Sequence, residues 1–265
     1  MRAVIQKALN ARNMGLVRYI DRPRLRRLVR SLHPVVTHAA LMRVGGDGDG
    51  GYLVPDDLDG VTACFSPGVD RIASFEQAIA DRGIPCFLAD ASVEEVPVDD
   101  DRLHFDKKFL GVWNDDLMIT LETWVNLHAP GGGDLILQID IEGAEWPVIL
   151  NVPDYVLDRF RIIVIEVHSF NKMLEVETFP LLETALTRLT RKFHVVHNHP
   201  NNVYGEMDLG DIKIPRLFEL TLLRKDRADA IRYAVEFPNT LDQTNVPALP
   251  DIILPPQWYG GSLTE

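Results

Sequence analysis

The sequence has little cysteine, with only Cys64 and Cys86 among its 265 residues. Both lie in apolar runs, so we expect two buried thiols in a reducing compartment, and neither a disulfide framework nor a cysteine metal site. No stretch approaches the roughly 20 consecutive apolar residues that a membrane-spanning helix needs. The first residues also lack the apolar block of a signal peptide. These absences predict a cytoplasmic protein without a membrane span.

Positive charge is also scarce, since 27 Lys and Arg stand against 39 Asp and Glu, for a net charge of −12. This balance disfavours a groove for a polyanion, and with it a nucleic-acid partner. One segment differs, because leucines at helical spacing alternate there with six arginines: Arg18, Arg22, Arg24, Arg26, Arg27 and Arg30. The pattern predicts an amphipathic helix with a solvated basic face. A patch for an acidic partner, a phosphate-bearing acceptor or a membrane surface is the alternative.

Strand and helix patterns alternate along most of the chain. Hydrophobic residues make up 46% of it, which suffices for one sizeable core. Residues 1–44 are expected to be a helical extension, residues 45–237 the main domain, and residues 238–265 an extended Pro-rich tail. Continuous apolar strands predict a mostly parallel sheet, buried on both faces and flanked by helices, in a Rossmann-like α/β fold. The expected strands are 52–54, 61–65, 84–88, 103–105, 135–141, 161–167, 193–196 and 217–223, and the clearest helices are 74–83, 117–125 and 179–191.

Ligands of open parallel sheets bind beyond the carboxyl ends of the strands. The strand at 61–65 leads into Ser66-Pro67-Gly68, where a glycine permits close approach of the backbone. Ser74 and Gln77 have the form of a capping box for the helix that follows. The next strand ends at Asp90 and Ala91, and an acid about 20 residues past the turn suits the hydroxyls of a ribose. A dinucleotide would require G-x-G-x-x-G, which the turn lacks, so S-adenosylmethionine is the preferred cofactor.

A glycine-dense loop spans residues 45–51 and leads into Tyr52. Asp47 and Asp49 begin the spacing of a calcium-binding loop, but Gly51 and the residues that follow do not complete it. We therefore expect a backbone loop that closes over the cofactor, with Asp49, Gly51 and Tyr52 as contacts. Lys107 and Phe109, after the third strand of the main domain, are weaker candidates near the adenine.

Ionisable residues gather where the later strands end. Asp140 and Glu166 follow apolar strands, and burying a lone carboxylate is costly, so a function is expected of both. Together with Asn198 they could hold magnesium, which prefers oxygen ligands. Without a metal, His168 is the first choice as general base. The remaining catalytic candidates are Glu142, Glu145, His197 and His199, although Glu142 and Glu145 could instead be charges that complement a helix dipole.

The segment 137–146, with Asp140, Glu142 and Glu145, resembles the D-x-E-G-x-E segment of the FkbM-type methyltransferases. Residues 43–54 resemble the glycine-rich entry segment of part of that group, and residues 66–69 with 74–76 are similar to its first cofactor motif. The resemblance covers residues 43–224 and implies a class I methyltransferase fold. It also implies an S-adenosylmethionine site at Ser66, Pro67, Gly68, Ser74, Asp90, Ala91 and Asp140. Pro67 stands where a glycine is common, so contacts to the methionine carboxylate should differ.

These observations predict an S-adenosylmethionine-dependent O-methyltransferase. The resemblance implies a sugar or oligosaccharide acceptor, with a methylmannose oligosaccharide as one candidate. Transfer would be an in-line displacement assisted by a base or a divalent metal. The alternatives are a non-catalytic binding domain on the same scaffold, a methyltransferase of polyketide or other small-molecule hydroxyls, and a nicotinamide-dependent oxidoreductase. The N-terminal amphipathic helix and the Pro-rich tail could both contribute to a homodimer.

Overall fold

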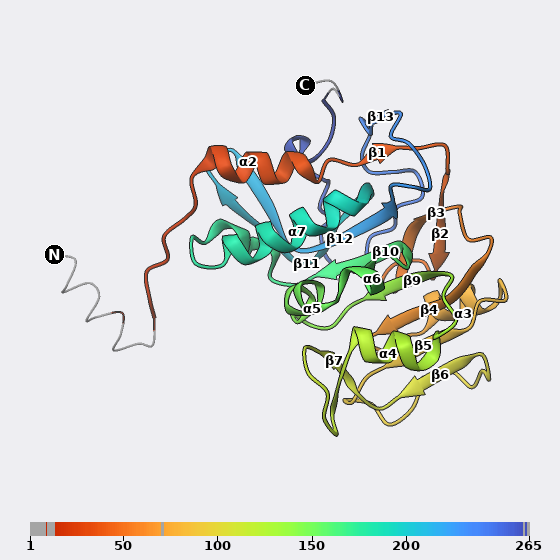
Figure 1. The fold of residues 1–265 in the computed structure, drawn as a ribbon. Helices are drawn as coiled ribbons and strands as arrows, with labels where there is room; N and C mark the ends of the chain where they lie inside the picture. Colours follow the sequence, from red (N-terminus) through yellow and green to blue (C-terminus); the bar gives the residue numbers. More distant parts are fainter. Residues whose placement is uncertain (1–8, 10–13, 70–71, 262, 264–265) are drawn as a thin grey trace.

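A large, mostly parallel sheet organises the molecule (Figure 1). The computed structural model describes residues 9, 14–69, 72–261 and 263. Seven strands lie in the order β11-β12-β10-β9-β4-β5-β6, and all neighbours are parallel except the two pairs that involve β12. The strands are β4 (Val61–Pro67), β5 (Cys86–Ala89), β6 (Leu103–Asp106), β9 (Asp134–Ile139), β10 (Phe160–Val167), β11 (Phe193–Leu209) and β12 (Ile212–Arg224). The predicted mixed α/β architecture is confirmed.

The strand order reverses direction between β4 and β9. From β4 the chain moves to β5 and β6 on one side, and from β9 to β10 on the other. The crevice above the carboxyl ends of β4 and β9 is therefore a topological switch point, where open α/β sheets bind their ligands.

Successive side chains of a strand point to opposite faces of the sheet. An apolar cluster covers each of the two faces. Along β10, Ile163 and Ile165 belong to one apolar cluster, and Ile162 and Val164 belong to the other. The first cluster includes side chains of the helices α2 (Arg22–Ser31), α4 (Leu121–His128), α5 (Glu145–Asn151), α6 (Asp154–Leu157) and α7 (Phe179–Lys192). The second includes α3 (Ser74–Ala80) and the hairpin of β2 (Leu41–Gly45) and β3 (Gly51–Pro55).

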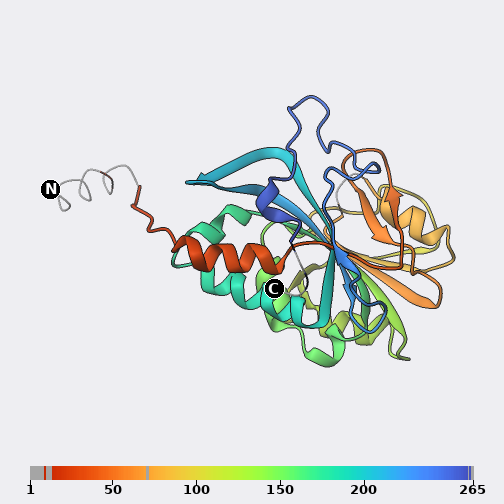
Figure 2. The same ribbon diagram turned by 90° about the horizontal axis from the view of Figure 1, so that it is seen from above.

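Helix α2 is the predicted amphipathic helix, and it lies beside α7 (Figure 2). Asp21 caps it by accepting a hydrogen bond from the Arg24 backbone N–H. Its leucines are buried, while the Arg24 side chain pairs with Glu183 of α7 and lies over the Phe179 ring. The helix is thus packed on the core, as the solvated-face interpretation predicts: Arg22, Arg26, Arg27 and Arg30 are exposed, and Arg24 is half-buried against α7.

The expectation of a wholly helical segment 1–44 is wrong beyond α2. The residues that follow α2 form β1 (Val35–Val36) and β2, because β1 pairs with β13 (Arg232–Tyr233) and β2 pairs with β3. Residues 1–8 and 10–13 lie outside the described part of the chain. The helix expected from residue 117 begins at Leu121 instead, since β8 (Met118–Thr120) pairs with β7 (Phe109–Gly111) before it.

β11, β12 and the tail depart from the alternation of strands and helices seen in the rest of the chain. β11 and β12 run longer than predicted, and their far ends extend beyond the rest of the sheet (Figure 2). The η2 turn of the tail (Pro256–Trp258) buries Trp258 against Phe170 and Phe218. The other short helix, η1 (Phe170–Leu174), follows β10.

The sequence predicts two buried thiols and no membrane-spanning helix. Cys64 and Cys86 are free and buried, and they lie opposite each other on β4 and β5. Within the described residues, no helix combines the length and hydropathy needed to cross a bilayer.

Candidate active site

A row of buried polar side chains crosses one face of the sheet near its carboxyl edge. Ser66 of β4 donates a hydrogen bond of 2.6 Å to Gln138 of β9, whose amide nitrogen lies 3.3 Å from the Tyr52 hydroxyl. That hydroxyl donates to Glu166 of β10 at 3.4 Å. The row therefore links three strands of the sheet to the β2–β3 hairpin that covers them.

Glu76 of α3 sets the direction of these hydrogen bonds. Its carboxyl contacts Ser66 Oγ, which also faces the Gln138 carbonyl oxygen, yet a serine hydroxyl has one proton to donate. Burial raises the pKa of Glu76, although its bond to Ser66 opposes the shift. A neutral Glu76 can donate to Ser66, which leaves the Ser66 hydrogen free to be donated to Gln138.

Glu166 and Glu219 lie opposite each other on β10 and β12, and both are buried. Burial, followed by the charges of Asp140 and Glu219, raises the pKa of Glu166 well above its ordinary value. Burial also raises the pKa of Glu219 to about 8, against a hydrogen bond from Asn245 that lowers it. Both carboxyls are therefore harder to ionise than an exposed glutamate.

The predicted magnesium set of Asp140, Glu166 and Asn198 is not assembled. The amide that reaches Glu166 belongs to Asn201, at 3.1 Å. Asn198 pairs with a β12 residue whose side chain lies in the first apolar cluster, on the face of the sheet away from Glu166. The Asn198 side chain therefore donates to the carbonyl of Leu32 instead.

A second group surrounds His168, directly after β10. His168 Nδ1 lies 3.1 Å from Glu145 Oε1, and Nε2 lies 3.2 Å from Glu142 and 3.8 Å from Asp140. Glu145 is fully buried at the start of α5, and the same Oε1 accepts the backbone N–H of Gly143 at 3.0 Å. Glu145 therefore orients both the turn after β9 and the imidazole, which a solvated helix charge would not do. We call these four side chains, Asp140, Glu142, Glu145 and His168, the His168 cluster.

Two members of the His168 cluster have pKa values suited to proton transfer. Burial lowers the pKa of His168, but the hydrogen bond with Glu145 and the charges of Asp140, Glu145 and Glu142 outweigh it, so the net shift is upward. Burial raises the pKa of Asp140 to about 7, with His168 opposing the shift. Asp140 Oδ1 is buried and has no hydrogen-bond partner in the described part of the chain. It is an acceptor available to a ligand.

Backbone strain marks the same place. Among the described residues, only Glu142 and Ser169 are non-glycine residues with positive φ, at 55° and 52°. Each such conformation costs on the order of 1–3 kcal/mol and tends to occur at functional sites. Glu142 is itself a member of the His168 cluster, and Ser169 directly follows His168.

A small cavity of about 70 Å³ lies at the switch point. Its lining includes Asp49, Tyr52, Gly68 and Asp140, which the sequence predicts to be cofactor contacts. Gly68 has a φ of 92°, and a Cβ there would lie 1.4 Å from the Asp140 carbonyl oxygen. Only glycine can therefore bring the turn after β4 so close to the end of β9.

The glycine-dense loop is tied to α3 by Ser74, but not as a capping box. Ala73 is the N-cap of α3 and Ser74 is its first residue, so the capping-box prediction is wrong. The Ser74 hydroxyl instead accepts from the Gly46 N–H at 3.0 Å and donates to the Gly50 carbonyl at 3.1 Å. Gly51 closes the base of the loop, where a Cβ would lie 2.0 Å from the Gly46 oxygen. Ser74 and Gly51 shape the loop.

The other expected cofactor contacts, Pro67, Asp90 and Ala91, lie at or directly after the end of a strand. Asp90 comes after β5 and accepts from the Ser92 N–H at 2.6 Å, and Ala91 follows it. Pro67 accepts a hydrogen bond of 3.3 Å from the Asp140 N–H. The cavity is smaller than the roughly 300–1,000 Å³ of ordinary ligand pockets.

His197 lies apart from the His168 cluster. It lies on β11, which β12 separates from β10, and its Nε2 is 2.8 Å from Asp242 of the tail. The predicted catalytic role beside His168 therefore has no geometric support. Asp242 and Asn201 carry no distinguishing sequence signal. Glu219 does, because it is a lone carboxylate in an apolar strand, as Glu166 is.

Comparisons with known proteins give one family match and two distant structural matches. No curated protein sequence matches the chain. The N-terminal domain of EvdMO1, solved in the presence of SAH and D-fucose, is 12% identical over 78% of this chain and 97% of that one, with a TM-score of 0.31. Full EvdMO1 is 13% identical over 79% of this chain, which spans about half (48%) of that chain, with a TM-score of 0.30. The sequence model described as Methyltransferase FkbM domain matches residues 118–195, a segment that contains the whole His168 cluster.

Proposed function

We propose that the protein is an S-adenosylmethionine-dependent O-methyltransferase acting on a hydroxyl of a sugar or oligosaccharide, such as a methylmannose oligosaccharide. The observation that carries the proposal is the His168 cluster beside the switch-point cavity, within the segment that matches the FkbM domain. The strand order with antiparallel β12 supports a Rossmann-like class I methyltransferase domain over residues 45–237.

S-adenosylmethionine supplies the methyl group in this proposal. The chain holds it with the Gly68 turn and Asp140 on the sheet side, and with Asp49 and Tyr52 on the hairpin side. Asp90 and Ala91 continue the site along the strand ends toward a ribose. Ser66, Pro67, Gly51 and Ser74 act by holding the turn and the loop in place.

His168 is the proposed general base. Its Nδ1 hydrogen is held by Glu145, so the neutral ring presents the lone pair of Nε2 toward Glu142 and Asp140. An acceptor hydroxyl within reach of Nε2 gives up its proton there as the oxygen becomes the nucleophile. The donor set of this cluster includes an imidazole and so does not fit magnesium, which prefers oxygen ligands. No step is therefore assigned to a metal.

The acceptor is proposed to bind in an open depression of about 570 Å³ beside His168. Ser169, Asn171, Tyr204 and Arg216 line it together with Glu142. The Tyr204 ring is 59% exposed and offers an apolar face of the kind on which the C–H face of a pyranose packs. The amide and guanidinium groups around it provide donors for sugar oxygens.

Calorimetry with S-adenosylhomocysteine and, separately, with NAD tests the cofactor, and we expect only the former to bind. A labelled methyl donor with a panel of methylated and unmethylated oligosaccharides then identifies the acceptor. His168→Gln should retain S-adenosylhomocysteine binding and lower kcat by about 10²–10⁴. His194→Gln, on β11 outside the cluster, is the matched control. Tight NAD binding, absent S-adenosylhomocysteine binding, or normal turnover in His168→Gln would overturn the proposal.

A further inference from the structure

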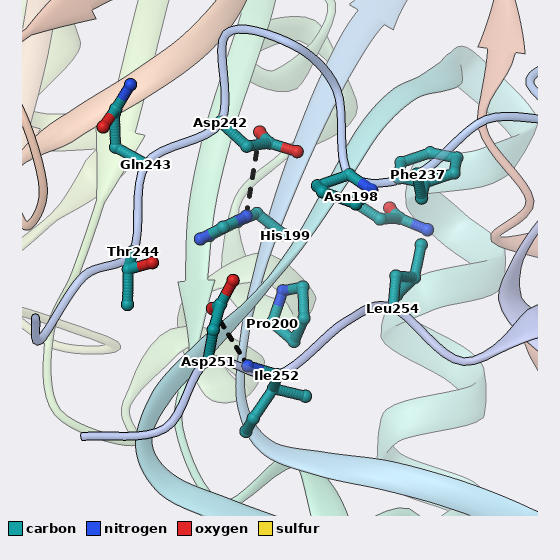
Figure 3. A pocket seen from close by; sticks show the side chains of 11 residues that line it. Asn198, His199, Pro200, Phe237, Asp242, Gln243, Thr244, Asp251, Ile252 and Leu254 are labelled. Atoms are coloured by element: carbon teal, nitrogen blue, oxygen red, sulfur yellow. Dashed lines mark hydrogen bonds and ion pairs between the residues drawn. The ribbon is translucent and has the colours of Figure 1, made fainter.

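Three side chains outside the His168 cluster converge where the tail crosses β11. The donor atoms of His197, His199 and Asp242 all lie within 4.8 Å of one another. His197 Nε2 is 2.8 Å from Asp242 Oδ1, and His199 Nδ1 is 3.7 Å from the same oxygen. Figure 3 shows the His199 ring facing Asp242 across the pocket. One carboxylate oxygen thus faces two imidazoles.

The hydrogen bonds of Asn245 determine which nitrogen of His199 is protonated. Asn245 Nδ2 donates to Glu219 at 2.6 Å, so its oxygen is the atom 3.0 Å from His199 Nε2. That Nε2 must therefore carry a hydrogen. In a neutral ring, the lone pair then lies on Nδ1, which faces Asp242. The arrangement resembles the way metal-ligating histidines are oriented by a hydrogen bond on the other nitrogen.

The Nδ1 lone pair of His199 and the carboxylate of Asp242 face each other inside the protein. His197 and His199 are only 3% and 8% exposed. The Nδ1 lone pair of a neutral His199 and the Asp242 carboxylate are both acceptors, and they face each other in a buried place. That arrangement is unfavourable unless a cation lies between them.

We propose that His197, His199 and Asp242 bind one divalent transition-metal ion, of which zinc is the representative. Imidazole with carboxylate suits zinc and its neighbours in the first transition row, and it does not suit magnesium. Ligation requires His197 Nε2 to lose the hydrogen that it shares with Asp242, which a shift of that hydrogen to Nδ1 of the same ring provides. The fourth ligand is a water in the adjoining cavity of about 50 Å³, beside Gln243 and Thr244.

The proposed ion joins parts of the chain that are distant in sequence. Asp242 belongs to the tail, and the histidines belong to β11, so the metal fastens the tail to the edge of the sheet. Asn245, three residues after Asp242, already contacts the buried Glu219. The metal site therefore anchors the tail next to Glu219. It is separate from the His168 cluster and does not depend on the proposed function.

Metal analysis of the full chain tests this site. Protein stripped with a chelator is reloaded with Zn²⁺ or Co²⁺, and we expect one equivalent of metal per chain, visible absorption from bound Co²⁺, and a rise in Tm with Zn²⁺. His199→Gln and Asp242→Asn should each weaken Zn²⁺ binding at least about 100-fold, since loss of a direct ligand exceeds the known effect of outer partners. His194→Gln, on the same strand, should bind normally.

The same measurements can overturn the proposal. His168→Gln tests the competing set of Asp140, Glu142 and His168, whose donor atoms are also close together. Loss of zinc in that variant, with retention in His199→Gln, would place the metal there instead. Failure of the wild-type chain to bind Zn²⁺ or Co²⁺ would leave a hydrogen-bonded His197–Asp242 anchor and refute the metal site. The wild-type Co²⁺ spectrum needs no variant, so misfolding of a variant cannot decide the outcome.

Discussion

Replacing Glu219 by glutamine should stabilise the protein at alkaline pH and leave its stability at pH 5 nearly unchanged. Glu219 is 6% exposed and lies opposite another buried carboxyl in the sheet. Its side chain accepts a hydrogen bond from Asn245, and a glutamine oxygen can accept the same bond. The variant therefore removes the capacity to ionise while keeping the shape and the contact.

The magnitude follows from the pKa of Glu219, which is raised from 4.5 to about 8, chiefly by burial. Below pH 4.5 the carboxyl is protonated whether the chain is folded or unfolded, so its full stabilising contribution is present. As the pH rises from 4.5, the unfolded chain ionises and the folded chain does not. The free energy of unfolding then falls by about 1.4 kcal/mol per pH unit until pH 8 is passed, for a total of about 5 kcal/mol.

Urea unfolding of the wild type and Glu219→Gln at pH 5 to 9 measures this loss. The stability difference between them should grow by about 1.4 kcal/mol per pH unit and level off above pH 8. Glu177→Gln, which replaces an exposed carboxylate, should follow the wild type at every pH. Parallel pH profiles for the wild type and Glu219→Gln would show that Glu219 is ionised in the folded protein and would refute the reasoning.

Three further outcomes are expected. Gly68→Ala should destabilise the fold by more than about 2 kcal/mol in urea, while Gly83→Ala, which has open space around it, should cost about 1 kcal/mol; equal losses would contradict the close approach after β4. Glu145→Gln should lower the pKa of His168 by about 1–2 units in an NMR titration, because a hydrogen bond to a charged partner contributes about 1.5–3 kcal/mol, and an unmoved titration would reject that coupling. Ser74→Ala removes both bonds between Ser74 and the glycine-dense loop, so S-adenosylhomocysteine affinity should fall about tenfold, and undiminished affinity would separate this contact from the cofactor site.

The sheet was predictable because its strands are continuous apolar runs. Such a run is a local property, and β10 is buried at every residue, as its Ile and Val content predicts. The segment after α2 was not predictable as strand in the same way. β1 has two residues and exists only because β13, almost 200 residues later, supplies its partner.

Parts of the candidate site were also visible in the sequence. Asp140, Glu166 and His168 each end an apolar strand, and parallel strands bring such ends to one edge. Their partners were not visible, since Asn201 and not Asn198 reaches Glu166. That choice depends on irregular pairing between β11 and β12, which shifts the register at two places. A shift of one residue exchanges the two faces of a strand.

Short segments carry three signals: apolar strands that end in ionisable residues, apolar residues at helical spacing, and the glycine turn. These signals suffice to predict the α/β sheet and the edge at which a ligand would bind. Which ionisable groups meet, and in which protonation state, depends on register, on the path of the tail and on how deeply each group is buried. The pairing of Asp242 with His197 and the raised pKa of Glu219 arise only when residues far apart in sequence exclude water from the same place.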